Sequence, residues 1–120
     1  MSVGITGGTA SASAALAFNA QTGTTYTFVL ADADNKLVTA SNASAQTYTI
    51  PLNSSVAYPT GTQINLIQIG AGQVTVQGAS GVTLASSGAT STTPKCRAQY
   101  SAMTLVKNNT DSWYAIGDIA

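Results

Sequence analysis

The segment that decides the fold is Thr62-Gln63-Ile64-Asn65-Leu66-Ile67-Gln68-Ile69. A run this apolar, bounded by turn signals, predicts a β-strand, and we expect it at the centre of the core. Gly70-Ala71-Gly72 follows as a turn, and residues 73–77 follow as a second strand. The turn has two glycines of a dinucleotide-binding loop but lacks the third, and no helix follows it, so a hairpin turn is predicted.

Similar short segments recur at a spacing of about 8–12 residues, which is typical of a β-sandwich or barrel. The apolar side of one long segment changes between Tyr100 and Met103, which predicts a bulge or bend there. We therefore expect an all-β protein, a single-domain antiparallel β-sandwich or barrel-like fold. The further strands are predicted at residues 24–30, 36–40, 46–50, 55–58, 82–84, 97–107 and 112–116.

The N-terminal part of the chain has a different composition from the rest. Residues 4–17 are almost wholly Gly, Ala, Ser and Thr. They contain too few large apolar side chains to hold a helix without outside support. We expect residues 1–18 to form an N-terminal arm that is flexible or laid on a neighbour, and residues 19–120 to form the β-domain.

One internal echo suggests a repeat. Tyr26 and Tyr48 each lie within a Thr-x-Thr pair, and they are 22 residues apart. A solenoid needs at least about three repeats, and the sequence offers one echo. The echo alone therefore does not predict a solenoid.

Charged residues are scarce, at 7% of the 120 residues with a net charge of zero, where a soluble domain has about 25%. A neutral chain has no electrostatic footprint for nucleic acid, and no stretch is long and apolar enough for a membrane helix. The sequence has no His and no Glu, which removes the commonest general bases and metal ligands. These features predict a non-enzymatic protein that has no cofactor and no metal, and that binds neither nucleic acid nor membrane.

Two features of the sequence resemble parts of metal sites but lack the further ligands that such sites require. The lone Cys96 allows no internal disulfide and no zinc site, and is interpreted as a small buried residue. Asp32-Ala33-Asp34-Asn35 begins like a calcium loop, but Leu37 and Ala43 occupy the positions that require Gly and Glu. A turn capped by Asp and Asn side chains is predicted instead.

The aromatic residues are the candidates for an interface. Tyr100, Trp113 and Tyr114 form either an exposed sugar- or partner-binding patch, or packing in the core and across a hairpin. A receptor-binding module would need a pocket, expected around Tyr100, Trp113 and the loop 86–93. The full candidate interface set is Phe18, Tyr58, Tyr100, Trp113 and Tyr114.

Several runs resemble a module of tailed-bacteriophage structural proteins. The resemblance covers about residues 19–118 and implies a β-rich virion module with no catalytic residues. The runs that carry it are residues 20–33, 38–51, 61–64, 70–76, 99–102 and 105–107, together with Trp113 and Gly117-Asp118.

Such modules often end longer tail-fibre or minor-tail proteins, whereas this chain starts with its own Met and has only a short arm ahead of the β-domain. We therefore expect a capsid decoration (cement) protein, forming a homotrimer and bound to the major capsid protein or another virion protein. The alternative is a tail-fibre or tail-tip module that binds a host receptor. With no signal peptide recognised, the expected location is the virion, assembled in the host cytoplasm.

Overall fold

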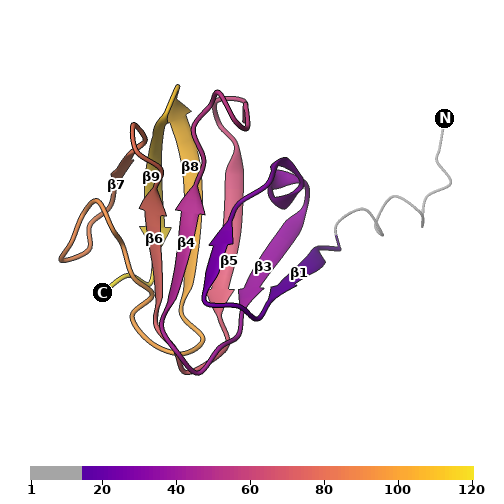
Figure 1. Ribbon diagram of the computed structural model, residues 1–120, viewed down its shortest axis with the longest axis vertical. Coiled ribbons are helices and arrows are strands. Elements are labelled where there is room, and N and C mark those ends of the chain that lie inside the picture. Colours follow the sequence, from indigo (N-terminus) through magenta and orange to yellow (C-terminus); the bar gives the residue numbers. More distant parts are fainter. Residues whose placement is uncertain (1–14) are drawn as a thin grey trace, which may run out of the picture.

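The computed structural model describes residues 15–120, which are built almost wholly of β-strands (Figure 1). The expectation of an all-β fold is confirmed. Residues 1–14, most of the expected arm, lie outside the described residues. The elements in chain order are β1 (Ala17–Gln21), β2 (Thr25–Thr27), the short 3-10 helix η1 (Leu30–Ala33), β3 (Lys36–Ala40), β4 (Gln46–Ile50), β5 (Gln63–Gln68), β6 (Val74–Gly78), β7 (Thr83–Ala85), β8 (Ala102–Asn109) and β9 (Ser112–Gly117).

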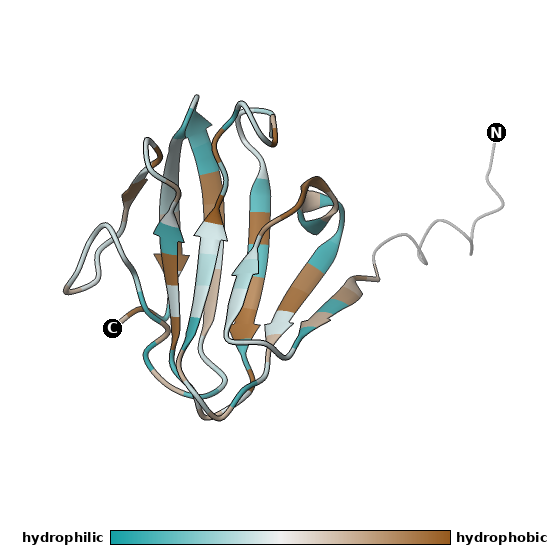
Figure 2. Cartoon of the chain, viewed as in Figure 1, coloured by the Kyte–Doolittle hydropathy of each residue, from teal (hydrophilic) through white to brown (hydrophobic). Residues whose placement is uncertain are grey.

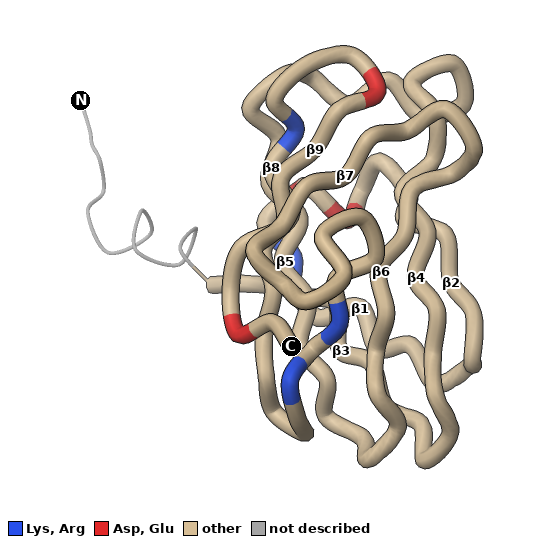
Figure 3. The backbone as a smooth tube through the Cα atoms, turned by 90° about the vertical axis from the view of Figure 1, so that its left-hand side faces the viewer, with Lys and Arg blue, Asp and Glu red and all other residues tan. Residues whose placement is uncertain are grey.

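The first six strands alternate between two sheets. The larger sheet has the order β1-β3-β5-β8-β9-β7, and the smaller sheet has the order β2-β4-β6. The strands β1, β3 and β5 pair in parallel, and so do β2, β4 and β6. Each passage through both sheets makes one coil, so three coils stack side by side. Figure 3 shows the two sheets as separate layers.

The turns that lead from the larger sheet to the smaller one stack at one end of the molecule, at the bottom of Figure 1. Asn42, in the turn of the second coil, donates from Nδ2 to the carbonyl oxygen of Thr22 at 2.8 Å. Its own carbonyl oxygen accepts the N–H of Gly72 at 2.8 Å. A Cβ atom at Gly72 would lie 1.9 Å from the carbonyl oxygen of Ser44, so this close approach requires glycine. Asn42 thereby connects the turns of all three coils.

A C-terminal hairpin widens the larger sheet. The strands β8 and β9 pair antiparallel and lie between β5 and β7. Because β8 is antiparallel to β5 and β7 is parallel to β9, β7 runs in the same direction as β5. The β8–β9 hairpin therefore lies between β5, the strand of the third coil, and β7, the strand with which a fourth coil would begin.

The inner faces of both sheets share one core. Apolar and polar positions alternate along the strands, as the brown and teal bands of Figure 2 show. The rings of Tyr26 and Tyr48 pack with a tilt of 54° and centroids 5.5 Å apart, and Tyr58 packs edge to face on Trp113 at 5.3 Å. The buried apolar core consists of Phe28, Val38, Ala40, Tyr48, Ile50, Tyr58, Ile64, Leu66, Val74, Val76, Leu84, Cys96, Met103, Leu105, Trp113 and Ala115.

The prediction of an antiparallel fold is wrong for five of the seven strand pairings, which are parallel. The turn at residues 70–72 is not a hairpin, because it carries the chain from β5 to β6 in the other sheet. Alternation along a strand identifies its buried face but not the direction of its neighbour, so the pattern of residues 62–77 fits both arrangements.

Three predicted strands differ from the observed elements. Residues 55–58 form turns and irregular backbone instead, with the N–H groups of Ser55 and Val56 bound to the carbonyl oxygen of Leu52. Residues 97–101 precede β8 as bends and turns, so the expected irregularity near Tyr100 falls outside the strand. The predicted strand 24–30 ends at Thr27, and η1 follows it.

Candidate interaction face

The side of the larger sheet that faces away from the core is the candidate functional site. Strand pleating places alternate residues on this side, and the pairing register aligns them in rows across the strands. Phe18 lies beside Leu37, and Leu37 beside Asn65. We call this set the outer face: Phe18, Ala20, Leu37, Thr39, Gln63, Asn65, Ile67, Thr83, Ala85, Ala102, Thr104, Val106, Tyr114 and Ile116.

The outer face is uncharged and partly apolar. No residue of the set carries a charge. Phe18 is 70% exposed at one side of the sheet, and Ile116 and Tyr114 are 57% and 51% exposed toward the other side. In the middle, Thr104 Oγ1 donates to Asn65 Oδ1 at 2.7 Å. Exposed apolar side chains with polar groups beside them are typical of protein contact sites.

A shallow hollow of about 260 Å³ lies at the β7–β9 side of the larger sheet. Tyr114 and Ile116 contribute from the outer face, and Ser86 and Ser87 contribute from the loop after β7. The pocket expected around Tyr100, Trp113 and the loop 86–93 differs from this hollow, whose lining includes Ser86 and Ser87 but neither Tyr100 nor Trp113. The hollow is too open to enclose a small ligand, but it can receive a side chain of a partner.

The five aromatic candidates do not form one patch. Trp113 and Tyr58 are 1% and 3% exposed, so they belong to the core and not to an interface. Phe18 and Tyr114 are exposed on the outer face, separated by the strands between β1 and β9. Tyr100 is exposed in the loop before β8. The sequence reasoning missed Leu37, Ile67, Val106 and Ile116, although their alternation with buried neighbours was a usable signal.

Tyr100 has an unusual backbone conformation. Its φ of 69° lies in the left-handed region, which costs a bulky residue free energy. The N–H of Tyr100 donates to the carbonyl oxygen of Gln68 at 2.6 Å, and Gln99 Nε2 donates to the carbonyl oxygen of Ile69 at 3.0 Å. These bonds hold the loop against the end of β5 and present the Tyr100 ring to solvent.

A buried carboxylate organises the first coil. Asp32 is 1% exposed and accepts three hydrogen bonds, from Asn19 Nδ2 at 2.7 Å, from the Tyr26 hydroxyl at 2.6 Å and from the Val29 N–H at 2.9 Å. Burial, and then the neighbouring Asp32, raises the pKa of Tyr26 to about 12. The same two causes raise the pKa of Tyr48 to about 12. These three fixed donors take the place of water around the buried carboxylate, so the role of Asp32 is structural.

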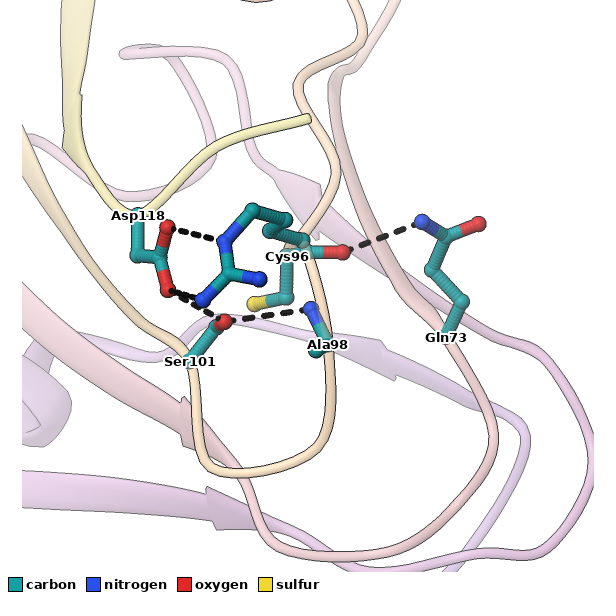
Figure 4. A network of polar contacts seen from close by, with 6 residues as sticks. Gln73, Cys96, Ala98, Ser101 and Asp118 are labelled. Atoms are coloured by element: carbon teal, nitrogen blue, oxygen red, sulfur yellow. Dashed lines mark hydrogen bonds and ion pairs between the residues drawn. The ribbon is translucent and has the colours of Figure 1, made fainter.

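Among the described residues, Arg97 and Asp118 form an ion pair. Two guanidinium nitrogens of Arg97 contact the carboxylate at 2.7 and 2.9 Å, and Ser101 Oγ donates to it at 2.7 Å (Figure 4). These hydrogen bonds lower the pKa of Asp118, and the carboxylate raises the pKa of Arg97. The pair ties the loop before β8 to the chain after β9. Because it is exposed, it contributes little to stability.

The described residues hold no group of three or more His, Cys, Asp or Glu side chains that could bind a metal ion. Cys96 is buried, as interpreted from the sequence, and burial raises the pKa of its thiol to about 11. Such a thiol is a poor nucleophile at neutral pH. Within residues 15–120, no helix has the length and hydropathy needed to cross a membrane.

Comparisons with known proteins return no match among protein-family models, curated proteins or solved structures.

Proposed function

We propose that this chain is a non-enzymatic structural protein of a bacteriophage virion that stabilises the capsid lattice as a decoration protein. The single observation that carries the proposal is the outer face, which is wide, uncharged and apolar at both sides. Six strands give it a width of about 24 Å. Contact through such a face gains free energy from burial of apolar surface.

The lack of charge is what makes this face suitable for a protein partner. Burying an unpaired charge in an interface costs several kcal/mol, and an uncharged face avoids that cost. The polar groups at its centre, Asn65 and Thr104, already bond to each other. The partners proposed are the major capsid protein or another virion protein, together with further copies of this chain in a homotrimer. Exchange of the N-terminal arms would add contacts between the copies.

A tail-fibre or tail-tip module that binds a host receptor is the second candidate. The observation that favours it is the hollow beside Tyr114 and Ile116, which offers an aromatic wall and two serine side chains. Aromatic surfaces with nearby hydroxyl groups suit a receptor with both apolar and polar parts.

The test compares two variants that add the same charge to different faces. Ile116→Lys places a cation on the outer face, while Thr27→Lys places one at an exposed position of the smaller sheet. Each is measured by light scattering and by cosedimentation with expanded capsids of the phage that encodes the chain. We expect wild-type and Thr27→Lys protein to bind and Ile116→Lys to bind at least about tenfold more weakly, a loss of about 1.4 kcal/mol.

Two results would contradict the proposal. One is a wild-type protein that stays monomeric at high concentration and does not bind capsids. The other is an Ile116→Lys protein that binds as well as wild type. Binding to host cells instead of capsids, with density at the tail in electron micrographs, would establish the second candidate.

A further inference from the structure

The Lys107 side chain lies in the core without an ion pair among the described residues. The residue is 3% exposed, and it follows Met103 and Leu105 on the inner side of β8. Lysine is almost never fully buried unless it is paired. The ion pair within residues 15–120 belongs to Arg97 and Asp118, so Lys107 has neutral partners only.

Those partners bring the amine to a side-chain amide. Lys107 Nζ donates to Asn53 Oδ1 at 2.6 Å and to the carbonyl oxygen of Tyr58 at 2.6 Å. The Asn53 Cγ atom is bonded to Oδ1, so it lies within about 3.8 Å of the amine nitrogen. That separation is close to the near-attack distance of about 3–3.5 Å from which a nucleophile reacts.

The surroundings hold both groups in place, and Lys107 itself is buried. Trp113 lies opposite Lys107 in the β8–β9 pairing and packs edge to face on Tyr58. The Asn53 N–H donates to Asp111 Oδ1 at 2.6 Å, which fixes the turn that carries the amide. Asp111 therefore acts as a positioning residue. Held in this way, an amine and an amide that react slowly in water have a high effective concentration.

We propose that Lys107 and Asn53 join in an intramolecular isopeptide bond. The unprotonated Nζ atom attacks Asn53 Cγ, and a new C–N bond forms as the carbonyl π electrons move to Oδ1. When the carbonyl re-forms, the bond from Cγ to Nδ2 breaks. The proton released by the amine goes to the departing nitrogen, which leaves as ammonia. The step consumes no water and needs no oxidant, reductant or further reactant.

The bond would connect parts of the chain that are distant in sequence. Asn53 follows the second coil and Lys107 lies in the hairpin strand β8, 54 residues further on. A cross-link of that span restricts the unfolded chain and opposes separation of the hairpin from the coils. This inference is independent of the proposed function, because it concerns the chemistry of the core and not the outer face.

The test is the intact mass of the purified full-length protein. We expect a mass lower than the sequence mass by about 17 Da, the mass of one ammonia molecule. Proteolysis should then release a branched peptide that contains both Asn53 and Lys107. Lys107→Arg keeps the positive charge but lacks the amine, and should show the full sequence mass. Lys36→Arg, at a partly exposed lysine, serves as the matched control and should retain the loss.

Two outcomes would overturn the inference. A wild-type protein with the full sequence mass after incubation at neutral pH would show that no bond forms. A loss that persists in Lys107→Arg would show that the backbone nitrogen of Ser54 attacks the Asn53 side chain instead. That ring closure also releases one ammonia molecule, so it gives the same mass change. If a variant fails to fold, the wild-type peptides still distinguish the two reactions, because only the isopeptide bond yields a branched peptide that contains both Asn53 and Lys107.

Discussion

Replacing Gly72 by alanine should destabilise the protein strongly, because the glycine lies where the turns of the second and third coils touch. A Cβ atom at this position would be 1.9 Å from the Ser44 carbonyl oxygen and 2.7 Å from that of Asn42. Overpacking of this kind costs about 1–3 kcal/mol. Separating the turns to relieve it would also weaken the Gly72 N–H bond to Asn42, for about 1 kcal/mol more.

The expected cost of Gly72→Ala is therefore about 2–4 kcal/mol, which lowers the melting temperature by about 10–20 °C in a domain of this size. Gly23→Ala is the matched control, because Gly23 lies in the corresponding turn of the first coil. There a Cβ would be 3.7 Å from its nearest neighbour, an ordinary contact. Neither glycine has a φ in the left-handed region, so crowding alone separates the two variants.

Thermal unfolding followed by circular dichroism measures both variants, and urea titration provides the free energies. We expect Gly23→Ala to melt within about 3 °C of wild type, since alanine also restricts the unfolded chain. If Gly72→Ala melts as high as Gly23→Ala, the coils do not stack through this contact, and the reasoning about the turns is refuted.

Asp32→Asn should lower the unfolding free energy by about 2–3 kcal/mol in urea titration, because an amide cannot accept the three hydrogen bonds that the carboxylate accepts; an unchanged midpoint would contradict this. The raised pKa values of Tyr26 and Tyr48 keep both phenols protonated in the folded state while those of the unfolded chain ionise. Stability should therefore fall as the pH rises from about 10 to 12, and absorbance at the tyrosinate band should report ionisation and unfolding together. At the acidic end, four Asp and no Glu or His leave few groups to drive unfolding. The melting temperature should vary by less than about 10 °C between pH 7 and 5, and a larger drop would contradict this expectation.

Several strand positions could be predicted from sequence, because those strands have a local pattern of their own, whereas β1 was missed. Residues 36–40 and 46–50 are strands over those same ranges. The way the strands pair could not be predicted, because it depends on a repeat whose third copy is altered. Tyr26, Tyr48 and Val76 occupy the same place in the three coils. The spacing of 22 residues grows to 28, and the third member is not a tyrosine.

The cause of the altered spacing lies between β4 and β5. Residues 51–62 form a longer connection there than η1 and its neighbours form between β2 and β3. That extra length hides the repeat, although Thr25, Thr47 and Thr75 remain in register on the outside of the smaller sheet.

The candidate site could be predicted only in part. An aromatic residue on a strand fits the core and the surface equally well, and packing placed Trp113 inside and Tyr114 outside. Lys107 shares the alternation of Met103 and Leu105, so its buried position was visible in the pattern. Its charge favoured the opposite expectation, since buried lysines are rare. Which groups accept its hydrogen bonds depends on a contact across 54 residues, which no local pattern contains.

Because the coils stack in parallel register, the length of the molecule along the stack is a whole number of strand spacings. Each coil advances the stack by one strand spacing, about 4.8 Å. Asn42 forms a hydrogen bond to the turn on either side. Its side chain donates to Thr22 in the first coil, and its backbone carbonyl accepts from Gly72 in the third. A further coil next to the second one would need glycine at the positions that correspond to Gly70 and Gly72, because a Cβ atom there would meet the backbone of Asn42 and Ser44. With those glycines, each added coil would lengthen the stack by one strand spacing. The length of the stack could therefore change in steps of one coil while the strands at its two edges stay the same.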